Sequence, residues 1–274
     1  MTRKQLIEQI HQKKSYLCVG LDTDEEKIPV HLKSSSKAVF EFNKQIIDAT
    51  KDFCVSYKIN TAFYEALGSK GWEAMEQTVH YIPNTHFKIA DAKRGDIGNT
   101  STQYAKAFFE TIPFDAITIA PYMGEDSIRP FLEYENKFAI ILGLTSNKGA
   151  KDFEMQKLVG DNADSNNEYL YERVIKKVSS WGTPDNLMFV TGATQASELE
   201  NIRKIIPDNF LLVPGVGFQG GSLAEVSKYG LNKDCGLLVN ASRAIIYASD
   251  KENFAIEAGI IAQQYQQEMK DFIK

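Results

Sequence analysis

The sequence has few cysteines, and their positions favour neither disulfide pairing nor metal binding. Its three cysteines, Cys18, Cys54 and Cys235, are widely separated, and each lies within an apolar run. An odd number at such spacing argues against a disulfide framework and indicates a reducing compartment. We therefore interpret them as small buried hydrophobic residues, and we predict no metal site.

Long apolar runs and an excess of positive charge are also missing. No apolar run approaches the length of a membrane span, and residues 1–14 form a polar, helix-like segment without the apolar centre of a signal peptide. The formal net charge is −5, and the 31 lysines and arginines are spread along the chain. We therefore expect a cytoplasmic protein that binds neither membranes nor nucleic acid.

The sequence does contain a repeated alternation of two patterns. Short apolar, β-branched runs are each followed by polar turn residues and then, in many cases, by an amphipathic stretch such as 40–51, 72–82, 169–181 or 196–206. The apolar runs occupy residues 16–22, 53–60, 86–92, 116–122, 138–145, 187–193, 210–216 and 236–242. Eight such units in 274 residues predict an α/β fold, a (β/α)₈ TIM barrel that forms a single domain over residues 1–274.

Two features qualify this pattern. A doubly wound open sheet is the alternative fold, but it would place a glycine-rich fingerprint after the first strand, where this chain has GLDTDEEK (20–27). The segment 146–167 is long and polar and has no clear period. A loop of this length inside a compact domain is often a lid or a binding loop, so we expect it to lie over a site.

Opposing charges are concentrated directly after the third predicted strand. Asp91 and Lys93 are two residues apart, so in a regular strand they would point the same way, roughly 7 Å apart. Lys58 on the preceding strand could add a second ammonium. Asp96 follows at a turn or helix start, where a helix dipole favours a carboxylate, and it would share a helix face with Thr100. Such an array is either a structural ion-pair network or part of a catalytic site.

A second candidate site lies after the seventh and eighth predicted strands. The segments VPGVGFQGG (213–221) and NASRAI (240–245) occupy the two loops where many barrels bind a phosphate group. Glycines let backbone N–H groups approach an anion, Gln219 offers an amide donor, and Arg243 has a planar fork suited to phosphate oxygens. The alternative interpretation is a pair of tight barrel turns.

The motifs at the strand ends fit one known family. They are GLD (20–22), YKIN (57–60), DAKRGDIGNT (91–100), PYMG (121–124), TSN (145–147), PGVGFQGG (214–221) and ASRAI (241–245). Through these motifs the chain resembles the orotidine 5′-phosphate decarboxylase family, and most of all its longer bacterial form. The resemblance covers nearly the whole chain, and the Asp-x-Lys-x-x-Asp-Ile-x-x-Thr motif is its most specific part.

The resemblance implies a homodimeric barrel that needs no cofactor and converts orotidine 5′-phosphate to UMP and CO₂ in pyrimidine biosynthesis. Lys58, Asp91 and Lys93 would belong to one subunit, with Lys93 as the proton donor. Asp96 and Thr100 would reach into the site of the other subunit.

The resemblance also implies a set of substrate-binding residues. Asp22 would hold the ribose hydroxyls, and Ser146 would contact the pyrimidine ring. Gln219 and Arg243 would hold the phosphate. The remaining substrate-binding positions would be Pro214, Gly220 and Ser242, the last through its backbone because shorter relatives tend to have glycine there.

Two other functional classes remain open from the residues alone. The first is another barrel enzyme that acts on a sugar phosphate, either a Schiff-base aldolase using Lys93 or Lys58 or a metal-dependent epimerase. The second is a non-catalytic barrel that binds a phosphoribosyl nucleotide. That class would need the phosphate loops but not the charged residues from Asp91 to Asp96.

Overall fold

Eight parallel strands close into a barrel and follow one another around it in sequence order. The computed structural model describes residues 1–158, 168–193, 196–216 and 221–273. The strands are β1 (Leu17–Gly20), β2 (Ser56–Asn60), β3 (Phe87–Arg94), β4 (Ala116–Ile119), β5 (Phe138–Leu144), β6 (Leu187–Thr191), β7 (Leu211–Pro214) and β8 (Leu237–Ala241). Each strand lies within or overlaps one of the eight predicted runs, so the predicted barrel is confirmed.

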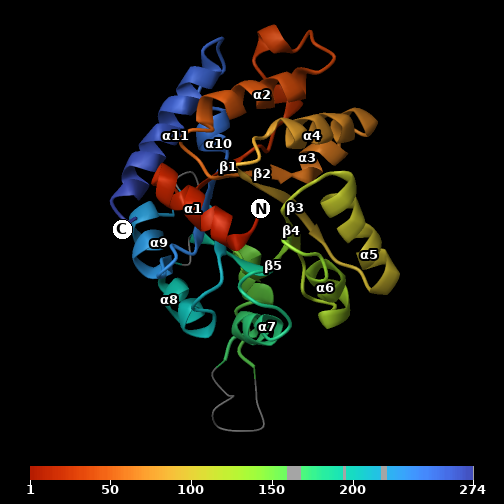
Figure 1. Cartoon of the computed structure of the whole chain (residues 1–274), viewed down its shortest axis with the longest axis vertical. Helices are drawn as coiled ribbons and strands as arrows, with labels where there is room; N and C mark the ends of the chain where they lie inside the picture. The colour runs from red at the N-terminus through yellow and green to blue at the C-terminus, as the bar shows by residue number, and fades with distance from the viewer. Residues whose placement is uncertain (159–167, 194–195, 217–220, 274) are drawn as a thin grey trace.

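Helices surround the barrel (Figure 1). They are α1 (Arg3–Lys13), α2 (Ala38–Thr50), α3 (Thr61–Glu65), α4 (Ser69–Tyr81), α5 (Gly98–Lys106), α6 (Glu125–Leu132), α7 (Leu170–Ser179), α8 (Ala196–Ile205), α9 (Leu223–Gly230), α10 (Arg243–Ile246) and α11 (Phe254–Lys270). The four amphipathic stretches predicted as helices correspond to α2, α4, α7 and α8. A π-helical turn at Ala107–Thr111 extends α5.

The strands are apolar along most of their length because both of their faces are covered. Every residue of β1, β4, β6 and β8 is buried. Side chains that point inward fill the barrel, and those that point outward pack against the helices. The few polar residues inside the strands, among them Lys58, Thr118 and Asn240, are therefore costly to bury and must find partners.

Helix α1 closes the end of the barrel at which the strands begin. Figure 1 shows it crossing the barrel, with the N-terminus near the centre. The N-terminal ammonium forms an ion pair with Asp115, just before β4. Arg3 bonds to the Asp208 carbonyl and to Asp234, just before β7 and β8. Because this end is covered, the opposite end, where the strands finish, is the one left open for a site.

The long polar segment after β5 is only partly described. A 3₁₀ helix occupies Lys148–Asp152, and Lys157 forms an isolated antiparallel bridge with Tyr169. Residues 159–167 of the predicted binding loop lie outside the described residues.

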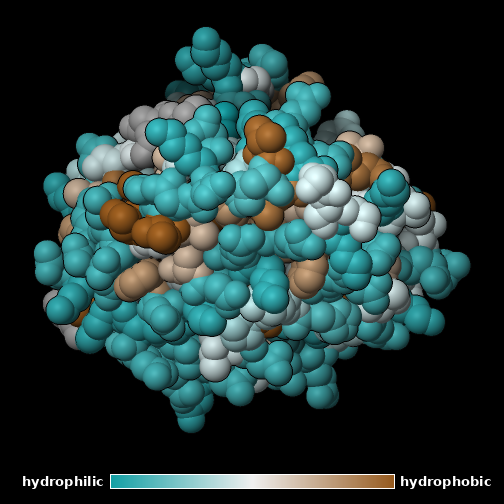
Figure 2. All heavy atoms as spheres, turned by 90° about the horizontal axis from the view of Figure 1, so that it is seen from above, coloured by the Kyte–Doolittle hydropathy of each residue, from teal (hydrophilic) through white to brown (hydrophobic). Residues whose placement is uncertain are grey.

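The face of the molecule in Figure 2 is mostly hydrophilic, with hydrophobic residues in small separate groups. Among the helices of the described residues, none combines the length and apolarity that a membrane span requires.

Candidate active site

A cavity of about 340 Å³ lies at the open end of the barrel, among residues at or just after the ends of the strands. Eight of the predicted site residues line it: Asp22, Lys58, Asp91, Lys93, Ser146, Pro214, Ser242 and Arg243. Gln219 and Gly220 lie outside the described residues. Residues more than 200 positions apart in the sequence therefore meet in one cavity, as the (β/α)₈ interpretation predicts.

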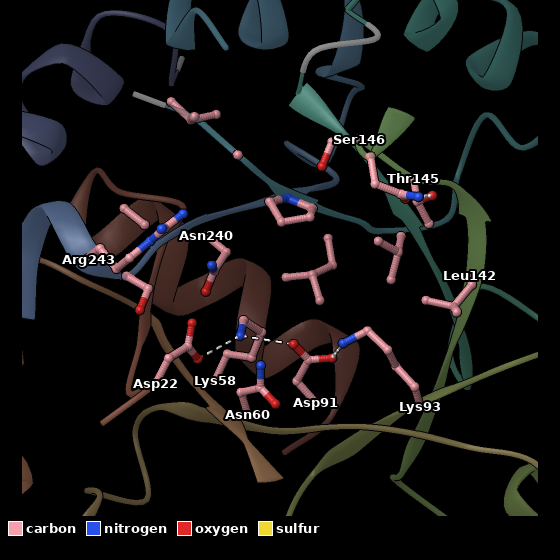
Figure 3. A pocket seen from close by; sticks show the side chains of 18 of the residues that line it. Asp22, Lys58, Asn60, Asp91, Lys93, Leu142, Thr145, Ser146, Asn240 and Arg243 are labelled. Carbon is pink, nitrogen blue, oxygen red and sulfur yellow. Dashed lines mark hydrogen bonds and ion pairs between the residues drawn. The ribbon is translucent and has the colours of Figure 1, made fainter. Parts of the chain in front are cut away.

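Four charged side chains form a row along one side of this cavity (Figure 3). The Lys58 ammonium lies 3.2 Å from Asp22 Oδ1 and 3.0 Å from Asp91 Oδ2. The Lys93 ammonium lies 2.5 Å from the other oxygen of Asp91, Oδ1. The order is thus Asp22, Lys58, Asp91, Lys93, with alternating sign, and we call these four residues the charge array. It includes three of the four residues predicted to alternate in charge.

Mutual attraction keeps the buried members of the charge array ionised. Burial by itself lowers the pKa of Lys58, but the carboxylates of Asp22 and Asp91 outweigh it and hold that pKa above its usual value. Burial by itself raises the pKa of Asp91, but Lys58 and Lys93 outweigh it and hold that pKa below its usual range. A buried lysine without such partners would lose its proton. The array is therefore a fixed field of charges in a partly dehydrated cleft.

Lys93 differs from Lys58 in exposure. The Lys58 side chain is only 5% exposed, whereas that of Lys93 is 50% exposed and lines the cavity. Both lysines line the cavity, but the ammonium of Lys93 is the more exposed to an incoming ligand, while Lys58 is enclosed between the two carboxylates.

The backbone at Lys93 departs from the regular strand that the spacing predicts. The β3–β4 register shifts between Ala90 and Arg94, and Lys93 has a φ of 48°, in the left-handed region. A non-glycine residue in this region costs about 1 kcal/mol or more. The regular alternation assumed for Asp91 and Lys93 is therefore interrupted, although both side chains still line the same cavity. The bulge instead lets the Lys93 side chain turn back to Asp91.

A buried network of hydroxyl and amide groups holds the segment that carries Asp22. The Tyr64 hydroxyl donates to the Leu21 carbonyl at 2.9 Å, and the Tyr247 hydroxyl donates to the Asp22 carbonyl at 3.2 Å. Asn43 on α2 donates in turn to the Tyr64 hydroxyl at 2.8 Å. Side chains from α2, from α3 and from the residue that follows α10 thereby hold the segment of the first carboxylate of the array.

Asp96 and Thr100 do not reach the cavity of their own chain. They are absent from its lining, and Thr100 is exposed. Helix α5 begins only at Gly98, which has a φ of 53°, so Asp96 precedes the helix and accepts a hydrogen bond from the Ile97 N–H. The predicted helix face shared by Asp96 and Thr100 is therefore wrong, because the turn at Gly98 separates the two residues.

The cavity has two further polar regions besides the charge array. In Figure 3 Arg243 lies on one side and Ser146 on another. The turn that carries Ser146 is held by Glu154, whose carboxylate accepts the Thr145 N–H at 2.7 Å and the Thr145 hydroxyl at 2.8 Å. Gly192 lies close behind this turn, since a Cβ there would be only 2.7 Å from Ser146 N.

Three further residues at the site had no predicted role: Thr118, Glu154 and Asn240. The Thr118 hydroxyl lies 3.0 Å from Asp91 Oδ1, and Asn240 lines the cavity with a buried Oδ1 that has no hydrogen-bond partner among the described residues. Thr118 leaves no signal in the sequence, because its contact with Asp91 lies where the β3–β4 register shifts between Ala90 and Arg94. Glu154 lies in an aperiodic segment and leaves no signal either.

Comparison with known proteins agrees with this geometry. A sequence model of the orotidine 5′-phosphate decarboxylase / HUMPS family matches residues 15–258. The orotidine 5′-phosphate decarboxylase of Phocaeicola vulgatus is 56% identical to the chain, over 98% of the chain and 98% of the relative. That of Christiangramia forsetii is 58% identical, over 98% of the chain and 97% of the relative. The structure of Leishmania donovani OMP decarboxylase superposes with a TM-score of 0.82 at 34% identity, over 99% of both chains. The chain therefore belongs to the orotidine 5′-phosphate decarboxylase / HUMPS family.

Proposed function

We propose that the chain is an orotidine 5′-phosphate decarboxylase, which removes CO₂ from orotidylate and forms UMP for pyrimidine biosynthesis. Full-length relatives of that name at 54–58% identity support the activity. The observation that carries the mechanism is the position of the Lys93 ammonium, 2.5 Å from Asp91 in the cavity.

The reaction needs direct electrostatic help. Loss of CO₂ from C6 leaves a carbanion in the plane of the ring, where the ring π-system delocalises it poorly. A fixed ammonium beside C6 would stabilise the developing charge and then donate the proton. Lys93 suits both roles because its ammonium is accessible from the cavity. A reaction at the slow extreme requires about 23 kcal/mol of barrier reduction, so other contacts must contribute.

In this mechanism the carboxylates of the array orient the ammonium groups. Asp91 would keep Lys58 and Lys93 charged and aimed, so that no reorganisation is needed when the bond breaks. The alternative role of Asp91 is repulsion of the substrate carboxylate in the ground state. The contacts of both Asp91 oxygens with lysines support the orienting role, because the paired carboxylate presents less free charge to a ligand.

The rest of the substrate would be held around the array. Asp22 would bind the ribose hydroxyls, Ser146 the pyrimidine ring, and Arg243 and Gln219 the phosphate. Pro214, Ser242 and Gly220 would complete the site. Binding energy gained at the remote phosphate would hold the ring against the array.

We propose that a second copy of the chain completes each site with Asp96 and Thr100. Both residues lie outside the cavity of their own chain, which supports a role elsewhere. Exposed apolar side chains accompany them, namely Ile97 at 55% and Met123 at 47% exposure. Met123 Cε would lie only 3.7 Å from a Cβ placed at Gly95, so this apolar surface adjoins Asp96. A symmetric dimer would bury it and present Asp96 to the partner's array.

One observation disfavours the aldolase alternative at Lys58. A Schiff-base lysine must be neutral to attack a carbonyl, whereas Asp22 and Asp91 outweigh the effect of burial and raise the pKa of Lys58. Borohydride treatment with a sugar phosphate should therefore trap no adduct at Lys58.

The activity is tested by incubating the purified protein with orotidylate and a chelator. We expect the absorbance of orotidylate to fall and one CO₂ to be released for each UMP formed, at the same rate with and without chelator. A chain that leaves orotidylate unchanged, or that loses activity with the chelator, would refute the proposed metal-independent decarboxylation. A mock preparation from cells that do not express the chain serves as the control for contaminating activity.

A further inference from the structure

Thr118 lies directly behind the charge array. It belongs to β4 and is 1% exposed. Its hydroxyl contacts two members of the array at once: Oγ1 accepts the Lys93 backbone N–H at 2.9 Å and lies 3.0 Å from Asp91 Oδ1. The side chain thus joins the carboxylate at the centre of the array to the backbone of the lysine that faces the cavity.

The direction of both hydrogen bonds is fixed by chemistry. A backbone N–H can only donate, so the Thr118 oxygen accepts from Lys93. The ionised carboxylate of Asp91 can only accept, so the single hydroxyl hydrogen of Thr118 is donated to it. The hydroxyl is therefore fully used, and a hydrogen bond to a charged acceptor is stronger than one between neutral groups.

The bond to Lys93 lies where the pairing of β3 and β4 is irregular. The β3–β4 register shifts between Ala90 and Arg94, and Lys93 within this bulge has a φ of 48°. Regular pairing resumes at Arg94, which lies opposite Ile119. The strained backbone at Lys93 is therefore held by a side chain of the neighbouring strand at the point where the ladder is interrupted.

We propose that Thr118 is a positioning residue for the reaction, which fixes the bulge at Lys93 and the orientation of Asp91 so that the ammonium points at the reacting carbon. The proposal rests on the proposed decarboxylase function. Thr118 need not touch the substrate, so its loss should lower kcat and leave KM nearly unchanged.

The chain offers a matched set of variants. Thr118→Val keeps the shape and removes the hydroxyl, whereas Thr118→Ser keeps the hydroxyl. Thr191→Val is the control, because Thr191 is another fully buried threonine of the barrel, on β6, and its Oγ1 has no hydrogen-bond partner among the described residues. Thr118→Ala removes the hydroxyl with a smaller side chain, in case the valine variant does not fold.

Two measurements test the proposal. In steady-state kinetics with orotidylate, we expect Thr118→Val and Thr118→Ala to lose roughly 10- to 100-fold in kcat with KM changed less than about threefold, and Thr118→Ser to recover most of the loss. Thr191→Val should keep the wild-type kcat. In hydrogen exchange, the Lys93 amide should exchange at least about 10-fold faster in Thr118→Val than in wild type or Thr191→Val.

The outcomes separate this proposal from the decarboxylase assignment. Equal kcat values for Thr118→Val, Thr118→Ala and wild type would overturn the positioning role, as would equal losses in Thr118→Val and Thr191→Val. If the wild-type protein does not decarboxylate orotidylate, the proposed function fails, and the exchange rate of the Lys93 amide still decides whether Thr118 holds the bulge. Unchanged exchange would overturn the proposal on geometry alone.

Discussion

Replacement of Asp91 by asparagine tests how the charge array works. Asparagine keeps the shape of the side chain and removes its charge. The Lys58 ammonium lies 3.0 Å from Asp91, a separation at which the attraction amounts to about 5 kcal/mol at an effective dielectric constant near 20. Desolvation offsets much of this attraction, and Lys58 retains Asp22 as a partner at 3.2 Å. We therefore expect the free energy of unfolding to fall by about 3 kcal/mol, the low end of the range for removing one partner of a buried ion pair.

The effect of Asp91→Asn on activity should be larger. The Lys93 side chain is half exposed, so its pairing with Asp91 adds little stability, about 1 kcal/mol or less. The pair instead contributes to the reaction, because Asp91 orients the Lys93 ammonium before the reaction begins. Loss of a preorganised electrostatic contact of this kind typically lowers kcat by about 10³-fold, or about 4 kcal/mol.

Steady-state kinetics of Asp91→Asn distinguishes the two roles proposed for this carboxylate. If Asp91 orients the lysines, kcat falls and the affinity for orotidylate stays the same or weakens. If Asp91 repels the substrate carboxylate, its removal relieves ground-state strain, so that KM and kcat fall together. Substrate binding that becomes tighter in the variant would refute the orienting role, provided that UMP binding is unchanged.

Three further predictions concern the rest of the molecule. When Lys93→Ala and Asp96→Ala proteins are mixed and their subunits exchange, about one quarter of wild-type activity should return, because half of the random dimers hold one intact site. If subunits demonstrably exchange and no activity returns, the shared site is contradicted. Arg243→Ala should raise KM by about 10²-fold or more through loss of a phosphate contact, and an unchanged KM would place the phosphate elsewhere. Burial and the nearby Lys13 charge lower the pKa of His86 to about 4. Below its ordinary pKa of about 6.5, the imidazole therefore stays neutral in the folded protein and takes up a proton when the protein unfolds. As the pH falls from about 6.5 to 4, this proton uptake should lower the free energy of unfolding by about 3 kcal/mol. In urea titrations, the free energy of unfolding of His86→Gln should fall by about that much less over the same pH range.

The barrel and most of the charge array were predictable because they follow from local patterns. Eight apolar runs give the strands, and parallel pairing in register brings their ends together: Asn60 lies opposite Asp91, and Lys58 lies opposite Ile89, two residues earlier on the same face. The same logic predicted that Asp22 and Arg243 would share a cavity. Position along a strand is enough to locate these residues.

Most of the remaining features depend on contacts that no local pattern contains. At the bulge the Lys93 N–H donates to the Thr118 hydroxyl of another strand, 25 residues away. The segment that carries Asp22 depends on Tyr247, whose hydroxyl comes from the far end of the chain. The start of α5 is set by the left-handed turn at Gly98, whose φ of 53° moves Asp96 out of the helix. The first two of these features are made by tertiary contacts, whereas the third is a local turn that glycine permits but does not require.

The most direct test of the account is the turnover of Lys93→Ala, measured together with its affinity for UMP. We expect kcat to fall by at least about 10⁴-fold, because the group that stabilises the carbanion and donates its proton is gone. UMP binding should remain measurable, because the phosphate and ribose contacts are intact. A Lys93→Ala protein with near wild-type kcat would contradict the central claim that this ammonium, held by Asp91, carries the chemistry.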